Sequence, residues 1–249
     1  APARASLPRA VTHPRARMSL PTARRRLLVT VLRRPRPFDL VLDLQRDAHA
    51  RVKSHESDDA LILCEHAPVV TVGKRAAMGM THVRTPLETL RALGIDVRET
   101  DRGGDVTYHG PGQVMAYPVM ALRRAGVGAR AYVEGLEGVV GDALREMGIE
   151  ARGGESGREG VWVGGNRKIA AIGVKISGGT SAHGTAVNVN PRLEDFEHIV
   201  PCGLEGSEVT SVVRELGREV DRREVETRLV DAFARRFGYR EVVWDERDE

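Results

Sequence analysis

Two reactive side chains stand in sequence contexts that suit covalent catalysis: Cys202 in "VPCG" and Lys168 at the start of "KIAAIGVKI". Pro201 fixes the backbone direction and Gly203 permits a close approach, so the thiol is expected at a turn beside an oxyanion-stabilising N–H. Lys168 is one of four lysines against 34 arginines, and an amine, unlike a guanidinium, can lose its proton near neutral pH. Taken singly, Cys202 is a candidate nucleophile and Lys168 a candidate proton carrier. The alternatives are a buried structural cysteine and a solvent-facing strand end.

A second chemical feature is the stretch "RGGDVTYHGPGQ" at 102–113, in which five of twelve residues are Gly or Pro. Glycine lets a backbone come close to another molecule because no Cβ intervenes. The stretch fits neither a P-loop nor a dinucleotide fingerprint. His109 in this stretch and His183 each precede a glycine, which places both as candidates to line one cleft or as hydrogen-bonded loop histidines.

Other catalytic patterns are weak or missing from the sequence. Cys64 and His66 lie close together, but the usual zinc spacings do not occur, so no metal site is expected. The sequence has no G-x-S-x-G elbow of the α/β-hydrolase type. Cys64 lies in the apolar run "LILC" and is expected to be buried. Two distant cysteines form no disulfide framework, which suits a reducing compartment.

Composition indicates an ordinary globular protein, with 41% hydrophobic and 29% charged residues. No apolar run approaches the roughly 20 residues that a membrane helix needs. Residues 1–36 hold ten arginines and no acid, so the net charge of +3 becomes −7 for the remainder. We expect residues 1–26 to be a flexible extension and 27–249 a single catalytic domain. A targeting segment or a nucleic-acid-binding arm are the alternatives for the extension.

Hydrophobic patterns predict an alternation of strands and helices along the domain. Asp39 is expected to cap a helix, and Thr85 with Glu88 reads as a capping box for another. Three closely spaced strands separated by Gly-rich turns predict an antiparallel meander. The predicted strands are 27–32, 60–64, 69–72, 95–99, 114–120, 159–163, 168–176, 184–189 and 240–244, with further helices at 129–147 and 222–237. This mixture predicts an α+β fold with a mixed sheet.

Taken in order, five segments resemble the octanoyltransferases, also called lipoyl(octanoyl) transferases or lipoate-protein ligase B. The segments are "EHAPVVTVGKR", "RGGDVTYHGPGQVMAYPV", "KIAAIGVKI", "SAHGTAVNV" and "FEHIVPCG". The resemblance covers about residues 27 to 215. Lys74 departs from the family's more frequent arginine.

The resemblance implies the α/β sandwich of biotin and lipoate protein ligases, related to class II synthetase cores. It implies a cofactor-free acyltransferase that moves octanoyl from octanoyl-acyl carrier protein to a lysine of lipoyl domains, and that also uses lipoyl-acyl carrier protein. The acceptors would be 2-oxoacid dehydrogenase E2 subunits and the glycine cleavage H protein, with no nucleic acid or membrane involved. The expected compartment is the cytoplasm, or the mitochondrion if the N-terminal extension is a targeting segment.

The resemblance also implies roles for individual residues. Cys202 matches the nucleophile that carries the acyl thioester, and Lys168 matches its partner. Small residues among the matched acyl contacts would leave room for methylenes, each worth about 0.8 kcal/mol when buried. The substrate-binding residues implied are Arg102, Gly103, Gly104, Asp105, Val106, Thr107, Tyr108, His109, Ala171, Ile172, Gly173, Gly184, Thr185 and Ala186.

Two rival functions remain open at this point. An ATP-dependent lipoate ligase of the same fold would need an adenylate site and no catalytic cysteine. A nucleic-acid module acting through the arginine-rich extension would leave Lys168, Cys202 and the Gly-rich stretch without a purpose.

Overall fold

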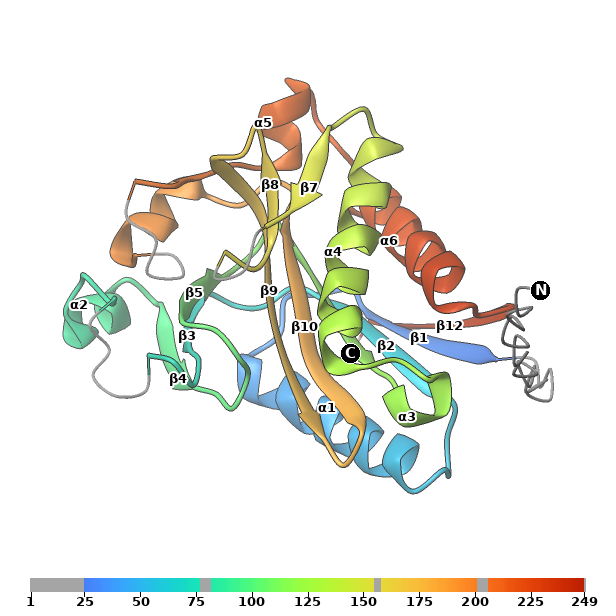
Figure 1. The fold of residues 1–249 in the computed structure, drawn as a ribbon. Helices are drawn as coiled ribbons and strands as arrows, with labels where there is room; N and C mark the ends of the chain where they lie inside the picture. The colour runs from blue at the N-terminus through green and yellow to red at the C-terminus, as the bar shows by residue number, and fades with distance from the viewer. Residues whose placement is uncertain (1–24, 77–81, 155–157, 201–205, 249) are drawn as a thin grey trace, which may run out of the picture.

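The computed structural model describes residues 25–76, 82–154, 158–200 and 206–248. Within these ranges nine strands form one large sheet: β1 (Arg26–Leu32), β2 (Asp59–Cys64), β6 (Gln113–Val119), β7 (Ala151–Gly153), β8 (Val161–Val163), β9 (Arg167–Ser177), β10 (Thr180–Asn188), β11 (Glu208–Val209) and β12 (Glu241–Arg247). Their spatial order is β12–β1–β2–β6–β10–β9–β8–β7, with β11 paired to β9 (Figure 1). β1 is parallel to β12 and β2, and the path from β2 to β7 is antiparallel, so the sheet is mixed.

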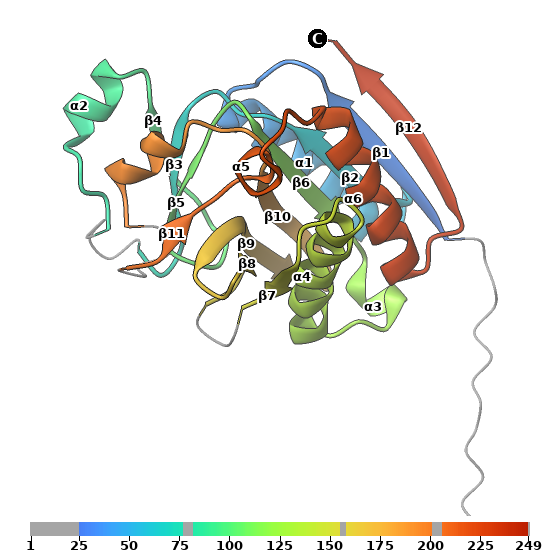
Figure 2. The same ribbon diagram turned by 90° about the horizontal axis from the view of Figure 1, so that it is seen from above.

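Helices cover both faces of the large sheet. Their bounds are Phe38–Lys53 (α1), Leu87–Ala92 (α2), Leu122–Ala125 (α3), Ala129–Arg145 (α4), Val212–Leu216 (α5) and Arg222–Phe237 (α6), with a 3₁₀ helix η1 at Leu193–His198. α1 lies on one face, and α4 and α6 lie side by side on the other (Figures 1 and 2). Alternation along β6 serves both layers, because Val114 and Ala116 face α4 and α6 while Met115 and Tyr117 face α1.

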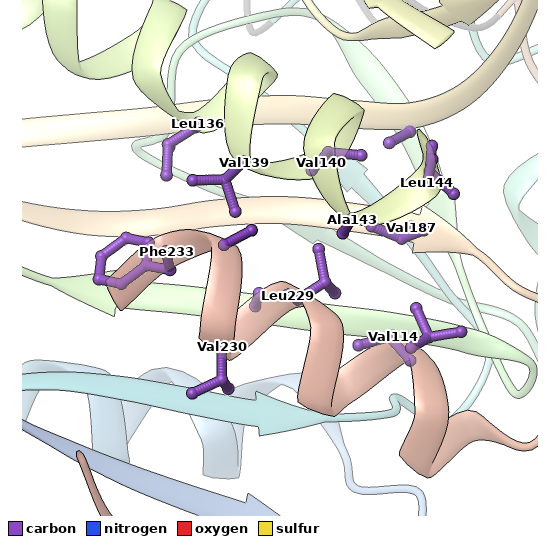
Figure 3. Packing of buried hydrophobic residues seen from close by; sticks show 14 of the residues in the cluster. Val114, Leu136, Val139, Val140, Ala143, Leu144, Val187, Leu229, Val230 and Phe233 are labelled. Carbon is purple, nitrogen blue, oxygen red and sulfur yellow. The ribbon is translucent and has the colours of Figure 1, made fainter. Parts of the chain in front are cut away.

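The main hydrophobic core lies between the sheet and the α4–α6 pair (Figure 3). Leu136 and Val140 of α4 and Leu229 and Phe233 of α6 are each at most 2% exposed. These side chains pack over Val187 of β10, so the sheet is supported from behind. The α1 face is therefore the face on which a ligand pocket can open without disturbing this core.

A smaller sheet positions the Gly-rich stretch. β3 (Val69–Val72) pairs in parallel with β4 (Asp96–Glu99) and antiparallel with β5 (Val106–His109). Its own core includes Val70, Tyr108, Phe196 and Ile199. Residues 102–105 connect β4 to β5, and the Gly103 N–H donates to the Val174 carbonyl of β9 at 2.9 Å. The connection thus lies directly against the large sheet.

This close approach depends on glycine. A Cβ at Gly173 would lie 2.8 Å from the Gly103 oxygen and 3.1 Å from Cδ of Arg102, closer than such atoms pack. Gly184, which pairs with Gly173 across β9 and β10, is in turn crowded by the backbone of Ala116 on β6. The two glycines are therefore needed for backbone to approach backbone, in addition to any room they leave for a ligand.

A β-bulge interrupts β9 beside Lys168. On β8, Val161 pairs with Ala170 and Trp162 pairs with Lys168, so Ile169 is an extra residue on β9. A bulge bends the strand and re-aims the neighbouring side chains. Lys168 consequently packs beside Trp162, and its side chain is only 5% exposed.

The sequence predictions are largely confirmed in outline. The meander appears as β8, β9 and β10, and the helices predicted at 129–147 and 222–237 are α4 and α6. Both capping predictions are wrong: α1 and α2 follow Pro37 and Pro86 without a side-chain cap. The Thr85 hydroxyl instead lies 2.9 Å from Nδ1 of His198. Among the described residues no helix is both long and apolar enough to cross a membrane.

Residues 1–24 of the predicted extension lie outside the described residues. Arg25 and Arg26 are described: Arg26 opens β1, and Arg25 donates to Asp59 at 3.0 Å. The division into an extension and one catalytic domain stays a prediction.

We predict that Gly173→Ala destabilises the protein by about 1–3 kcal/mol, the usual cost of overpacking. The added methyl group would push the 102–105 connection away from β9. Urea unfolding measures the change, and Gly128→Ala is the matched control because a Cβ at Gly128 meets no atom within 4 Å. The control substitution should cost less than about 1 kcal/mol. Equal stability of Gly173→Ala and the wild type would contradict the packing argument.

Candidate active site

A narrow pocket opens on the α1 side of the large sheet, between β9, β10, β5 and the 102–105 connection. Eleven of the fourteen predicted substrate-binding residues line it: Arg102, Gly104, Asp105, Thr107, His109, Ala171, Ile172, Gly173, Gly184, Thr185 and Ala186. The structure therefore brings together three segments, of which the first lies more than 60 residues before the other two in the sequence.

The other three predicted contacts lie elsewhere, for reasons of strand geometry. Val106 and Tyr108 alternate with Thr107 on β5, so they face the small core rather than the pocket. The Tyr108 hydroxyl donates to Asp195 at 2.7 Å. Gly103 uses its backbone to hold β9.

The pocket also has walls that the sequence reasoning did not identify. Phe38 at the start of α1 and Met115 and Tyr117 on β6 line it, together with Arg75, Glu159 and His183. Alternation within "QVMAYPV" could have indicated Met115 and Tyr117, because both fall on one face of a strand. Phe38 lies far away in the sequence, and no local pattern points to it.

Arg102 fastens the Gly-rich connection to β3. Its Nη2 donates to the Thr71 carbonyl at 2.7 Å, and its Nη1 donates to the Gly103 carbonyl at 3.0 Å. The guanidinium also donates to the Thr71 hydroxyl, and the residue is 8% exposed. Arg102 can therefore shape the pocket wall while much of its hydrogen-bonding capacity is directed into the protein.

Asp101, the residue just before this connection, is held by side chains of the large sheet. Its carboxylate pairs with Lys175 of β9 and lies 2.8 Å from Nε2 of His183 on β10. Burial would raise the pKa of Asp101, but its hydrogen bonds with Lys175 and His183 lower it to about 2. His183 adopts a left-handed backbone conformation, with φ of 57°, and its N–H donates to Gln45 of α1. The ion pair and the two strands fix the pocket from that side.

Burial favours the neutral form of His109, which lines the pocket floor, and of His66, whose ring centre lies 6.0 Å from that of His109. Burial lowers the pKa of His109 well below its usual value, and His66 and Arg102 lower it further. Burial also lowers the pKa of His66 to about 4. The His109 ring lies between Thr71 at 3.1 Å and Gln113 at 3.2 Å. A neutral floor of this kind suits an uncharged chain better than an anion.

A hydrogen-bond network runs from this floor to Lys168. The Gln113 amide donates to Asn188 at 2.9 Å, and Asn188 donates to the Thr210 carbonyl at 3.0 Å. The Thr210 N–H then donates to the Lys168 carbonyl at 2.9 Å. The pocket floor and the lysine are thus parts of one connected polar structure.

Lys168 presents a buried amine beside the pocket. Its Nζ donates to the Glu159 carbonyl at 3.0 Å and lies 5.0 Å from the centre of the Trp162 ring. Glu159 itself lines the pocket, so the amine is held next to the pocket's edge. A lysine this buried is uncommon, and proton transfer is one use for such a group.

The two cysteines differ in what can be said of them. Cys64 is fully buried in β2, and burial raises the pKa of its thiol, which matches the expectation of an inert cysteine. Cys202 lies outside the described residues. The neighbouring β11 is described, and Val209 pairs with Lys168 in the sheet.

Comparison with known proteins gives one consistent family. Residues 39–234 match the family described as the lipoyl protein ligase A/B catalytic domain. A mitochondrial octanoyltransferase of Arabidopsis thaliana is 43% identical over 82% of this chain and 86% of its own. An octanoyltransferase of Rubrobacter xylanophilus is 43% identical over 89% of this chain and 96% of its own.

Solved structures agree on the fold. A lipoate-protein ligase A bound with ATP superposes with a TM-score of 0.67 at 19% identity, covering 88% of this chain and 87% of that one. A putative lipoate protein ligase of Thermoplasma acidophilum gives 0.65 at 17% identity, with 90% and 88% covered. These likenesses confirm the predicted α+β ligase fold. With the sequence relatives they lead to one conclusion: the chain belongs to the lipoyl protein ligase A/B catalytic-domain family, and it is an acyltransferase related to the octanoyltransferases.

Proposed function

We propose that the protein transfers an octanoyl group from octanoyl-acyl carrier protein to a lysine of lipoyl domains, through an acyl thioester on Cys202. Lys168 acts as the acid and then the base of this transfer. The observation that carries the proposal is the buried Lys168 amine, held by the carbonyl of Glu159 at the edge of a narrow pocket. The homologous octanoyltransferases support the choice of acyl group.

The dimensions of the pocket suit a chain of about eight carbons. The pocket-lining residues of β10, from His183 to Ala186, span about 10 Å at roughly 3.3 Å per residue, and Ala171 to Gly173 of β9 pair alongside them. Burying a methylene contributes about 0.8 kcal/mol, so an octanoyl chain would gain several kcal/mol without carrying charge. The backbone and small side chains of β9 and β10 line the pocket together with the larger side chains of Phe38, Met115 and Tyr117.

Cys202 enters the proposal through the sequence and through its described neighbours. Val209, seven residues further along, is the pairing partner of Lys168, and the next residue donates to the Lys168 carbonyl. This return of the chain to Lys168 supports a meeting of the two side chains. An ammonium near a thiol lowers the thiol pKa, which favours the thiolate that attacks a thioester.

The reaction then balances without ATP. The Cys202 thiolate attacks the donor carbonyl, the bond to the pantetheine sulfur breaks, and Lys168 protonates the departing sulfur. Neutral Lys168 takes a proton from the acceptor amine, which attacks the acyl-enzyme and regenerates the Cys202 thiolate. Donor and intermediate are both thioesters, and the amide product is more stable, so no cofactor or metal is required.

Acceptor and compartment belong to the same proposal. We expect lipoyl domains of 2-oxoacid dehydrogenase E2 subunits and the glycine cleavage H protein as acceptors, and lipoyl-acyl carrier protein as a second donor. The cytoplasm is the proposed compartment, with the mitochondrion as the alternative, as for the Arabidopsis relative. Expression of a tagged chain with and without residues 1–24, followed by fractionation, distinguishes the two.

The first functional prediction concerns the covalent intermediate. Incubation with octanoyl-acyl carrier protein, without ATP, should add one octanoyl group to the protein, removable by hydroxylamine. Intact-mass spectrometry should find the adduct in Cys64→Ala, because Cys64 is fully buried, and should not find it in Cys202→Ala. An adduct that persists in Cys202→Ala excludes the proposed nucleophile. If the complete reaction strictly requires ATP, the protein is better explained as an ATP-dependent lipoate ligase.

The second prediction separates the charge of Lys168 from its proton. Lys168→Arg keeps a cation, so Cys202 should still react with iodoacetamide near neutral pH. Octanoyl transfer should fall by about 10²-fold or more, because a guanidinium does not give up a proton near neutral pH and so cannot serve as the base. Lys168→Met fills the space without charge and should lose both properties.

The matched control is Lys53→Ala, since Lys53 is exposed at the end of α1. This variant should transfer octanoyl at the wild-type rate. If Lys168→Arg also transfers at close to that rate, the acid–base role is wrong and Lys168 acts through its charge alone.

A further inference from the structure

A buried carboxylate lies on the other side of the peptide group that holds Lys168. Oε1 of Glu137 accepts the N–H of Gly160 at 3.1 Å, and the Glu159 carbonyl accepts Nζ of Lys168 at 3.0 Å. That N–H and that carbonyl belong to one planar peptide unit. Glu137, the 159–160 peptide and Lys168 therefore form a single line of hydrogen bonds from an acid to an amine.

The position of Glu137 is unusual for an acid. It lies on the apolar face of α4, beside the core residue Leu136, and is 9% exposed. Burial raises the pKa of Glu137, while the N–H of Gly160 opposes this effect. Among the described residues no arginine or lysine forms an ion pair with Glu137, although burying an acid in such a place is costly. The 159–160 peptide connects Glu137 to the cationic side chain of Lys168.

The surrounding backbone is shaped to fit this line. Gly160 has φ of 130°, which side chains rarely allow, and a Cβ there would lie 2.7 Å from Cε of Lys168. A Cβ at Gly153 would lie 2.6 Å from Oε2 of Glu137. The Gly154 N–H donates to the Gly160 carbonyl at 2.9 Å, which fixes the next peptide as well. Lys168 packs against Gly160 and Glu137 packs against Gly153, so a glycine lies at each end of this line of hydrogen bonds.

We propose that Glu137 is a positioning residue for acyl transfer, which holds and polarises the 159–160 peptide so that its carbonyl fixes the Lys168 amine. The inference rests on the proposed role of Lys168. A negative charge at the N–H strengthens the carbonyl as an acceptor, because hydrogen bonds in series polarise one another. A fixed amine keeps its proton in line with the reacting sulfur and nitrogen atoms, and small displacements in such geometry slow a reaction severely.

The test compares Glu137→Gln, which keeps an acceptor oxygen and removes the charge, with Glu137→Leu, which removes both. For transfer of octanoyl from octanoyl-acyl carrier protein to a lipoyl domain, Glu137→Leu should lower kcat by roughly tenfold or more. The KM for the donor should stay within about twofold, since Glu137 is not among the pocket residues. Glu137→Gln should restore part of kcat and still fall below the wild type.

Two control variants separate this role from stability. Glu134→Gln changes an exposed acid on the same helix, and Glu226→Gln changes an acid that is 1% exposed on α6. Neither should lower kcat, although Glu226→Gln should lower the melting temperature because it breaks ion pairs with Arg33 and Arg222. A loss of kcat in Glu226→Gln as large as that in Glu137→Gln would assign the effect to general destabilisation and overturn the proposal.

A double substitution tests whether Glu137 acts through Lys168. Glu137→Leu combined with Lys168→Met should be no slower than Lys168→Met alone, because the amine that Glu137 positions is already missing. Multiplied losses would overturn the proposal, as would wild-type kcat in Glu137→Gln. If Glu137→Leu does not fold, Glu137→Gln alone and combined with Lys168→Met gives the same two outcomes. If the wild type does not transfer octanoyl, the proposed function is wrong. That result differs from the results that contradict the role of Glu137, so the two proposals can be tested separately.

Discussion

The contact of one backbone with another, the 102–105 connection against β9, is the constraint on which the site depends. The hydrogen bond from Gly103 to Val174 forms because Gly173 presents no Cβ to the incoming chain. Without that contact the pocket would lose one wall, since Gly104 and Asp105 would no longer face β9 and β10. Gly103 and Gly173, which were expected to make room for methylenes, are therefore needed first for this backbone contact. The narrow pocket results from the contact.

The same constraint joins the pocket to the chemistry. Arg102 and His109 both bond to Thr71, so the Gly-rich stretch and β3 are held as one piece. From His109 the network continues through Gln113 to Asn188, and from there through Thr210 to the backbone of Lys168. Buried polar networks are rigid when every member has a partner. The network therefore fixes the backbone of Lys168 relative to the pocket floor.

Sequence reasoning recovered the parts of the fold that depend on local pattern. The meander of β8, β9 and β10 and the helix α4 follow from periodicity and glycine turns. The predictions failed where residues far apart in the sequence determine a contact. The Thr85 hydroxyl lies against His198 and does not cap α2. Phe38 lines the pocket from α1, in another layer of the fold. The bulge at Ile169, which re-aims Lys168, also leaves no signature in the apolar run "KIAAIGVKI". Eleven of the predicted acyl contacts line the pocket, and they were predicted from the family motifs and not from local pattern.

Lys168 is buried, and its surroundings must therefore satisfy its amine. Only 5% of the Lys168 residue is exposed, so its amine is poorly hydrated. The ammonium form then needs hydrogen-bond acceptors supplied by the protein. The Glu159 carbonyl and the face of the Trp162 ring supply two of them, and neither would form an ion pair that fixes the proton permanently. In the proposed mechanism, the position of Glu137 one peptide away from the amine avoids a direct ion pair with Lys168 and still places a carboxylate on the same line of hydrogen bonds.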